Sequence, residues 1–157
     1  MNKVAIVTGA GTGVGKATAV KLSDAGFSVI LIGRRKDKLE ETKTVCNDQA
    51  LVLPMDVSKE MDVKKCFEMI KKNFSRIDLL FNNAGTFLSS KTIDEINFSE
   101  WKEVIEVNIN GMFLFSKHAF SLMKNQSPMG GRIINNGSVS SITPRPGSIA
   151  YTATKHA

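Results

Sequence analysis

Residues 4–15 read VAIVTGAGTGVG, and this stretch decides what kind of fold the chain can adopt. Its first four residues form a short apolar run rich in β-branched side chains, which is typical of a strand buried in a parallel sheet. The turn leads into a helix that should end near Ala25, because Gly26 stands where a helix C-terminus favours glycine. The apolar face of this helix is expected to consist of Val14, Ala17, Leu22 and Ala25. A strand, a glycine turn and a helix in this order direct free N–H groups and the positive end of the helix dipole at a bound anion, usually a phosphate.

The glycine spacing separates this turn from two common phosphate-binding motifs. The pattern G-x-G-x-x-G does not fit, because counting from Gly9 or Gly11 puts a valine or a lysine at the third glycine position. A P-loop does not fit either, because the sequence Gly-Lys-Ser/Thr is missing. The residues from Thr8 to Gly15 instead match T-G-x-x-x-G-x-G, and in this they resemble the short-chain dehydrogenase/reductase family. Any tight strand-to-helix turn favours glycine, so the interpretation depends on the motifs further along the chain.

Composition and charge restrict the class of protein. The 157 residues are 42% hydrophobic and 23% charged, as in ordinary globular proteins, and no apolar run approaches the about 20 residues that span a membrane. Cys46 and Cys66 lack metal-site spacing and the first strand leaves no room for a signal peptide, so we expect a reduced cytoplasmic protein without membrane or metal binding. The net charge of +6 suggests nucleic-acid binding. We expect no nucleic-acid partner, however, because the basic residues are scattered among acids and only 7% of residues are aromatic.

The end of the second expected strand, residues 28–32, indicates which dinucleotide would bind. In a Rossmann fold an acidic residue at this point holds the ribose 2′-hydroxyl of NAD, whereas an arginine accommodates the 2′-phosphate of NADP. Here Gly33 takes the place of the acid and Arg34 follows it directly. Similarity to short-chain reductases with a basic residue here implies that NADP(H) is favoured over NAD(H), with Arg34 on the phosphate and Arg35 as a helper. The alternative is that both arginines only begin a solvated helix.

The middle of the chain should continue the alternation of helices and strands. They are expected over residues 36–47 (helix), 50–53 (strand) and 59–74 (helix). Ser58 is expected to cap the second of these helices, and Cys66 falls on its apolar face, so we interpret Cys66 as a core residue. The resemblance implies that Asp56 and Val57 lie beside the adenine ring.

A strand over residues 77–81 runs into Asn82-Asn83-Ala84-Gly85, which matches the second motif of the family. Small residues at a strand end let the backbone approach a ligand, and asparagine tolerates tight turns. The resemblance implies that Asn83, Ala84 and Gly85 line the adenosine-ribose side of the cofactor.

A long helix is expected over residues 98–124, with Ser99 as its N-cap. Asn108 and Gly111 lie in its interior, where neither residue type is favourable, so a compensating role is expected. The resemblance implies that Asn108 holds a water near the catalytic lysine; the alternative is a satisfied polar residue between helices. The equivalent helix of the family often packs against a second subunit, which implies a homo-oligomer, a dimer or a tetramer.

The catalytic candidates follow the fifth expected strand, residues 132–137. Tyr151 and Lys155 form Y-x-x-x-K, and residues four apart on a helix share a face. Ser138 lies 13 residues before the tyrosine, the separation usual in the family. The resemblance implies that Ser138 holds the substrate oxygen, Tyr151 acts as general acid–base, and Lys155 contacts the nicotinamide ribose. Asn108 would complete a proton relay.

The chemistry required of the tyrosine explains why a lysine accompanies it. A free tyrosine titrates at about pH 10, whereas acid–base catalysis near neutrality works best at about 7, a difference of roughly 4 kcal/mol. Burial alone disfavours the phenolate, so a nearby positive charge must outweigh it. Lys155 and an oxidised nicotinamide ring would supply that charge, while the hydride chemistry belongs to the cofactor.

Four motifs in family order therefore predict an α/β fold, a Rossmann-type doubly wound parallel sheet with helices on both faces, as a single NAD(P)-binding domain over residues 1–157. The expected cofactor contacts are Gly9, Thr12, Gly13, Val14, Gly15, Arg34, Arg35, Asp56, Val57, Asn83, Ala84, Gly85, Tyr151 and Lys155. Family members run to about 250 residues. We therefore expect that the last strands are lacking, that the fifth strand is an exposed edge, and that the chain alone has little activity.

Two functions remain open from the sequence. The first is an oxidoreductase that acts on a small-molecule carbonyl or secondary alcohol, which could be a 3-oxoacyl thioester, a sugar or a simple ketone. The second is a non-catalytic dinucleotide-binding module on the same fold. The presence of Ser138, Tyr151, Lys155 and Asn108 together favours the enzyme.

Overall fold

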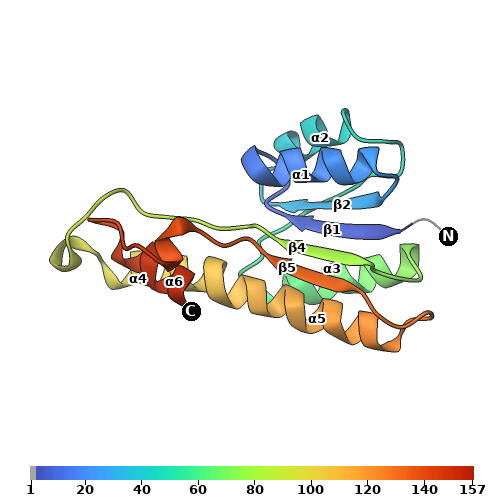
Figure 1. Cartoon of the computed structure of the whole chain (residues 1–157). Helices are drawn as coiled ribbons and strands as arrows, with labels where there is room; N and C mark the ends of the chain where they lie inside the picture. Colours follow the sequence, from blue (N-terminus) through green and yellow to red (C-terminus); the bar gives the residue numbers. More distant parts are fainter. Residues whose placement is uncertain (1–2) are drawn as a thin grey trace.

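A parallel sheet forms the centre of the molecule (Figure 1). The computed structural model describes residues 3–157, and its five strands lie in the order β3-β2-β1-β4-β5. The strands are β1 (Val4–Thr8), β2 (Ser28–Gly33), β3 (Leu51–Pro54), β4 (Leu79–Asn82) and β5 (Arg132–Asn135). Every neighbouring pair is parallel, and the strand order reverses between β1 and β4. This topology confirms the Rossmann-type α/β fold, and its reversal point is where such sheets bind ligands.

Helices cover both faces of the sheet, as predicted (Figure 1). One face carries α1 (Gly13–Asp24) and α2 (Lys36–Lys43), and the other carries α3 (Glu60–Asn73) and α5 (Met112–Asn125). Alternate strand residues enter two separate cores, because successive side chains of a strand point to opposite faces. Val7 and Leu31 pack with α1 and α2, whereas Ile6 and Ile30 pack with α3 and α5. The remaining elements are η1 (Ile93–Glu95), α4 (Phe98–Ile105), η2 (Glu106–Gly111), η3 (Val139–Ser141) and α6 (Ile149–His156).

The predicted apolar face of α1 is confirmed only at Leu22, which packs against the core on this side of the sheet, and is wrong at its other three residues. Val14 is 59% exposed, and Ala17 and Ala25 are exposed as well. The residues that face the sheet are the small ones four positions apart, Gly15, Ala19 and Ser23. Close packing is the physical reason: a Cβ on Gly15 would lie 2.1 Å from the Gly9 carbonyl oxygen. A helix that approaches the backbone this closely buries its smallest side chains, not its most apolar ones.

Two predicted helix caps are also wrong. The Ser58 hydroxyl donates to Asp56 Oδ1 at 2.8 Å, and α3 begins two residues later, after Lys59. Ser99 lies inside α4, which is capped instead by Asn97. The Asn97 N–H donates to Glu100 Oε2 at 2.9 Å in a reciprocal capping box. The observed cap, Asn97, therefore lies two residues before the predicted cap, Ser99.

The long helix predicted over residues 98–124 is continuous but irregular. A π-helical segment, η2, separates α4 from α5. Gly111 lies in this segment, and a Cβ there would come within 2.9 Å of Val57. Irregular helical turns of this kind are common at functional sites. Asn108 also lies in η2; because asparagine is unfavourable inside a helix, a compensating role is expected of it.

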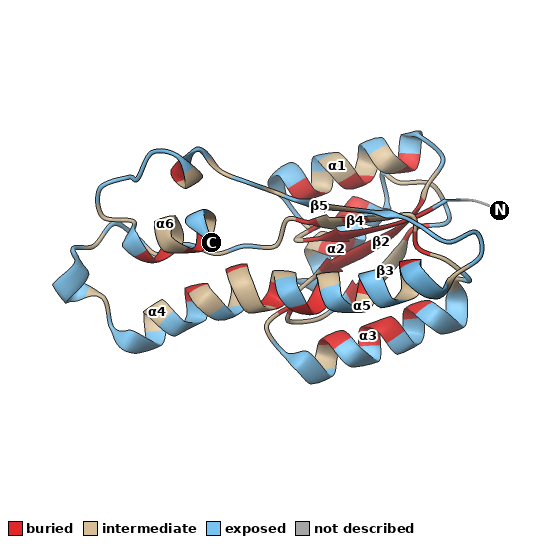
Figure 2. Ribbon diagram, turned by 60° about the horizontal axis from the view of Figure 1, so that its bottom comes forward, coloured by how far each residue is buried: buried red, intermediate tan, exposed pale blue. Residues whose placement is uncertain are grey.

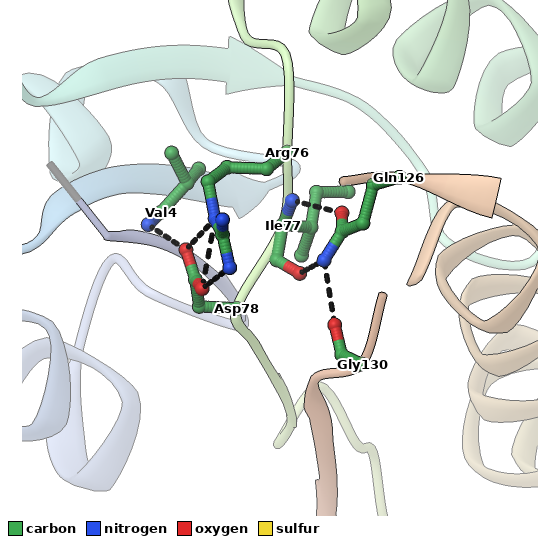
Figure 3. Close-up of polar contacts among 6 residues, drawn as sticks. All are labelled: Val4, Arg76, Ile77, Asp78, Gln126 and Gly130. Atoms are coloured by element: carbon green, nitrogen blue, oxygen red, sulfur yellow. Dashed lines mark hydrogen bonds and ion pairs between the residues drawn. The ribbon is translucent and has the colours of Figure 1, made fainter. Parts of the chain in front are cut away.

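The edge of the sheet where the strands begin is held by polar contacts (Figure 3). The Asp78 carboxylate accepts from the Val4 N–H at 2.8 Å and from two nitrogens of Arg76. Beside it, Gln126 accepts from the Ile77 N–H at 2.8 Å and donates to the Gly130 carbonyl at 2.6 Å. These contacts fix β1 and β4 to the end of α5 at the sheet edge opposite the glycine turn.

β5 is the exposed edge strand that the sequence predicted. Ile134 is 41% exposed, and Arg132 and Asn135 are exposed too, whereas the central strands are buried (Figure 2). Cys66 is fully buried in the core beneath α3, as predicted, and this burial raises the pKa of its thiol to about 12. Within residues 3–157 there is no helix long and apolar enough to cross a membrane.

Candidate functional site

The glycine turn between β1 and α1 forms the first part of the candidate site. Gly9 and Gly13 have φ angles of +66° and +54°, which residues other than glycine rarely adopt. The Ala10 N–H donates to the Ile32 carbonyl at 3.0 Å, so the turn is fixed to β2. Apart from its chain neighbours and the adjoining backbone of α1, no described atom lies within 4 Å of the position that a Cβ on Gly13 would occupy. The backbone is therefore open to a phosphate at the start of α1.

A hydrogen-bond network joins the glycine turn to the end of β4. The Thr8 hydroxyl accepts from the N–H groups of Asn83 and Ala84, at 2.9 and 3.0 Å. In return, Asn83 Nδ2 donates to the Thr8 carbonyl at 3.0 Å. The first motif and the second motif thus meet directly, because β1 and β4 are neighbours in the sheet.

A cavity of about 360 Å³ opens beside this network at the end of β2. It gathers nine of the predicted cofactor residues, namely Gly9, Thr12, Arg34, Arg35, Asp56, Val57, Asn83, Ala84 and Gly85. Gly13, Val14 and Gly15 lie at the start of α1, next to the turn. The other lining residues were not predicted as cofactor contacts; they are Gly11, Gly33, Lys38, Leu39, Met55 and Val107. Lys38 follows one turn after Arg34, and this spacing could have identified it as a third cation.

Three cations, Arg34, Arg35 and Lys38, line this cavity together with one carboxylate, Asp56. Arg35 Nη2 lies 3.5 Å from the Thr12 hydroxyl oxygen, so this side chain reaches back over the glycine turn. Burial raises the pKa of Asp56, but hydrogen bonds from Ser58 and the charges of Arg34 and Lys59 outweigh it, so that the pKa is lowered overall. Asp56 is therefore a carboxylate at neutral pH, and its charge is offset by the neighbouring cations.

Tyr151 and Lys155 lie on the same side of α6, as the Y-x-x-x-K spacing requires. Lys155 Nζ is 5.6 Å from the centre of the Tyr151 ring. The ammonium donates to the Asn136 carbonyl oxygen at 2.8 Å, just beyond the end of β5. Phe87, from the loop after β4, meets the tyrosine ring edge-on with the ring centres 6.5 Å apart. Neither Asn136 nor Phe87 was identified from the sequence.

Asn108 uses its whole amide on protein partners. Its Oδ1 accepts from the Thr86 N–H at 2.8 Å, while Nδ2 donates to the Thr86 carbonyl at 2.9 Å and to the Thr154 hydroxyl at 3.0 Å. Asn108 therefore fixes the loop after β4 to α6. It lines a second cavity together with Lys155, Asn136 and Ala84. Asn108 and Lys155 thus share one cavity lining, and the water that Asn108 is expected to hold near the lysine stays a prediction.

Ser138 and Tyr151 stand apart from both cavity linings. The Ser138 hydroxyl accepts from the Ser140 N–H at 3.1 Å at the start of η3. η3 packs against α6, which carries the tyrosine. The loop before α6 is held by the Lys91 N–H, which donates to the Gly147 carbonyl at 3.0 Å. Gly147 has a φ of +68°, and a Cβ there would collide with the Ser90 side chain.

The arrangement at the carboxyl ends of β1, β2 and β4, with Y-x-x-x-K beyond β5, can be compared with known proteins. A family model for short chain dehydrogenases matches residues 3–157. The chain belongs to the short-chain dehydrogenase family. An uncharacterized oxidoreductase of Staphylococcus aureus strain MRSA252 is 40% identical over 157 residues, which are 99% of this chain and 67% of that protein.

Solved structures of the short-chain dehydrogenase family share the fold. One, a short chain dehydrogenase from Bacillus anthracis, is 33% identical with a TM-score of 0.92 over 98% of this chain and 64% of its own. Another, a 3-ketoacyl-(acyl-carrier-protein) reductase from Brucella melitensis complexed with NADH, is 30% identical with a TM-score of 0.93. It is covered to the same extents, 98% and 64%. The chain thus spans slightly less than two thirds of these family members.

Proposed function

We propose that this protein transfers a hydride between NADP(H) and a carbonyl or secondary alcohol substrate. The observation that carries the proposal is the pairing of Tyr151 with Lys155, whose ammonium lies 5.6 Å from the phenol ring centre. A phenol beside an ammonium provides a proton donor next to a fixed positive charge, which is what acid–base chemistry on a substrate oxygen requires. Like the open glycine turn, the pair lies at the carboxyl ends of the parallel strands.

The residues present fit a dinucleotide. The turn offers an open backbone at Gly13, and the end of β2 offers cations with no acidic residue in the place of Gly33. When bound, the cofactor supplies or accepts the hydride. We assign the pyrophosphate to residues 9–15, the adenosine to Asp56, Val57 and Asn83–Gly85, and the nicotinamide ribose to Tyr151 and Lys155.

The chain's own groups would manage the proton. In the reducing direction Tyr151 gives its phenolic proton to the substrate oxygen, which becomes the hydroxyl of the alcohol. Lys155 stabilises the resulting phenolate by its charge, and the Ser138 hydroxyl holds the substrate oxygen. Asn108 keeps α6 and the loop after β4 in place, so the proton relay would pass through the cavity that it lines with Lys155. The phenolate then regains a proton from solvent along this path.

Arg34 is proposed to select NADP(H) by pairing with the 2′-phosphate. A fluorescence titration with NADPH and separately with NADH tests this, with Arg34→Ala beside the wild type. Loss of a charge-assisted hydrogen bond should weaken NADPH binding by roughly 10- to 100-fold and leave NADH binding within about twofold. Arg35→Ala, which removes a neighbouring cation, should have a smaller effect. A wild type that prefers NADH would overturn the cofactor assignment.

Hydride transfer is tested by the disappearance of NADPH absorbance with a panel containing a 3-oxoacyl thioester, a sugar aldehyde and a simple ketone. Consumption that depends on substrate supports the proposal. Tight NADPH binding without consumption on any substrate class would instead support a non-catalytic dinucleotide-binding module. We use the longest form of the protein that its gene encodes, since the relatives are longer than this chain.

A homo-oligomer is proposed from the outer surface of α5. Phe113 and Phe120 are 57% and 62% exposed, although each carries a large apolar ring. Exposed aromatic side chains on one helix are typical of a surface that is covered by a second subunit. Sedimentation should show a dimer or tetramer that Phe120→Asp dissociates, and a wild-type monomer at micromolar concentration would contradict the proposal.

A further inference from the structure

We propose that Asn136 is a positioning residue that couples Lys155 to the glycine turn. The inference rests on the function proposed above, because it concerns the two ends of the same cofactor site. Asn136 follows β5 directly and is half-buried. Its side chain reaches toward β4 and its carbonyl toward α6, so a single residue contacts both halves of the site.

The direction of each amide in this contact is fixed by its partners. Asn83 Nδ2 donates to the Thr8 carbonyl, which can only accept, so Asn83 Oδ1 must point the other way. That oxygen accepts from Asn136 Nδ2 at 2.9 Å. Asn136 must therefore present its amino group, and a side chain without a donor cannot replace it. The chain of contacts runs from the end of β1, through Asn83, to the end of β5.

The backbone of Asn136 completes the coupling. Its N–H donates to the Asn82 carbonyl at 2.8 Å, which continues the β4–β5 ladder. Its carbonyl accepts from Lys155 Nζ at 2.8 Å. With the N–H and the side chain both tied to β4, the peptide plane cannot turn freely, and the carbonyl stays directed at the lysine. The position of the ammonium is thereby set relative to Thr8 and the glycine turn.

The same contact lies between the two cavities of the site. Asn83 lines the nucleotide cavity, Asn136 and Lys155 line the neighbouring one, and Ala84 lines both. A dinucleotide that spans them would require the glycine turn and Lys155 to stand at a fixed separation. Edge strand β5 has no strand on its outer side in the described residues, so side-chain contacts such as this one must hold its end in place.

The test replaces Asn136 with aspartate, which has the same shape but no donor at neutral pH. In Asn136→Asp two oxygens would face each other across the contact with Asn83. Asn135→Asp is the matched control: it adds the same charge one residue away, but Asn135 Oδ1 accepts from Asn82 Nδ2 at 2.9 Å, and a carboxylate still can. We expect NADPH to bind about tenfold more weakly to Asn136→Asp than to Asn135→Asp. Circular dichroism should show that both variants are folded. If Asn136→Asp does not fold, the nearly isosteric Asn136→Leu takes its place in the same comparison.

Two further measurements separate coupling from general loosening. A protonated aspartic acid at position 136 can donate a hydrogen bond again. The ratio of the NADPH affinities of Asn135→Asp and Asn136→Asp should therefore approach one as the pH falls from about 8 to about 5. Because the 2′-phosphate of NADPH titrates near pH 6 and affects both variants alike, its contribution cancels in this ratio. Lys155→Met, alone and with Asn136→Asp, completes a double-mutant cycle. If Asn136 acts through Lys155, the double variant should bind NADPH no more weakly than the weaker single variant.

Affinities of the two aspartate variants within twofold of each other, or defects that multiply in the cycle, would overturn the role of Asn136. A wild type that binds neither NADPH nor NADH would instead overturn the proposed function. The two failures are therefore distinguishable in one set of titrations.

Discussion

The β1–β2 side of the sheet and the β5 side are stabilised in different ways (Figure 2). All five residues of β1 are buried, as are five of the six in β2, and helices cover them on both faces. β5 has three exposed residues out of four, and what holds its end is polar: Asn136 to Asn83, Asn82 to Asn135, and Lys155 to Asn136. The β1–β2 side is therefore stabilised by hydrophobic burial, whereas the end of β5 depends on a few directed hydrogen bonds. In the function proposed above, the first side binds the nucleotide and the second carries the catalytic residues.

This difference predicts that binding and turnover can be removed separately. Tyr151→Phe deletes one hydroxyl on α6 and leaves the glycine turn untouched, so turnover should fall by about 10²- to 10⁴-fold. The dissociation constant for NADPH should rise by no more than about tenfold, the loss of one hydrogen bond to the ribose. Steady-state kinetics and a fluorescence titration on the same preparation check both quantities. Loss of NADPH affinity in parallel with turnover would show that the two halves are not separable.

Core truncation on the two sides should differ several-fold in effect. Ile30 in β2 is 0% exposed, and Ile30→Ala should lower the free energy of unfolding by about 2–5 kcal/mol. Ile134 in β5 is 41% exposed, and the same change there should remove less than about 1 kcal/mol. Urea titrations of the two variants measure the difference directly. Equal losses would mean that the β5 edge is covered in solution.

A smaller loss is expected from crowding the glycine turn. A Cβ on Gly15 would lie 2.1 Å from the Gly9 oxygen and 2.6 Å from Asn83 Nδ2, so α1 must shift in Gly15→Ala. We expect a destabilisation of about 1–3 kcal/mol, together with weaker NADPH binding. In Gly13→Ala the added methyl meets open space, and only the positive φ is strained, at about 1 kcal/mol. Thermal unfolding that ranks Gly13→Ala as the more damaging change would contradict the packing of α1 described above.

The smallest effect concerns pH and the sheet edge opposite the site (Figure 3). Burial raises the pKa of Asp78, but bonds from Arg76 and the Val4 N–H outweigh it, so the folded pKa lies below the ordinary value. The unfolded chain then takes up the proton first, and the stability contributed by Asp78 is present above about pH 4 and lost as the pH falls below it. Asp78→Asn should lower the melting temperature by a few degrees at neutral pH and flatten its decline between about pH 5 and pH 3.

Asp24→Asn is the control for that measurement. Asp24 pairs with Lys21 at 3.6 Å, but both side chains are more than half exposed, so its removal should change little. If the melting temperature of Asp78→Asn declines between about pH 5 and pH 3 as steeply as that of the wild type, groups other than Asp78 cause the pH dependence.

Local sequence was enough for the elements whose signals lie within a few residues. The β-branched run at residues 4–7, the spacing of Val63, Cys66 and Ile70, and the Y-x-x-x-K pair all appear in the structure where expected. The caps at Ser58 and Ser99 were misplaced by one or two residues, since several adjacent side chains could form each cap. The face of α1 was assigned wrongly because periodicity counts apolar residues, whereas close approach to the sheet selects small ones.

The sequence by itself determined the fold class, the glycine turn and the identity of the candidate catalytic residues, because each depends on a short pattern with its own local physics. Only the tertiary structure decided which strand ends become neighbours. The order β1-β4-β5 brings Thr8, Asn83 and Asn136 together across 128 residues of sequence, and it carries Lys155 to the same edge. Such contacts depend on strand pairing and helix packing over the whole chain, and no window of the sequence contains both partners.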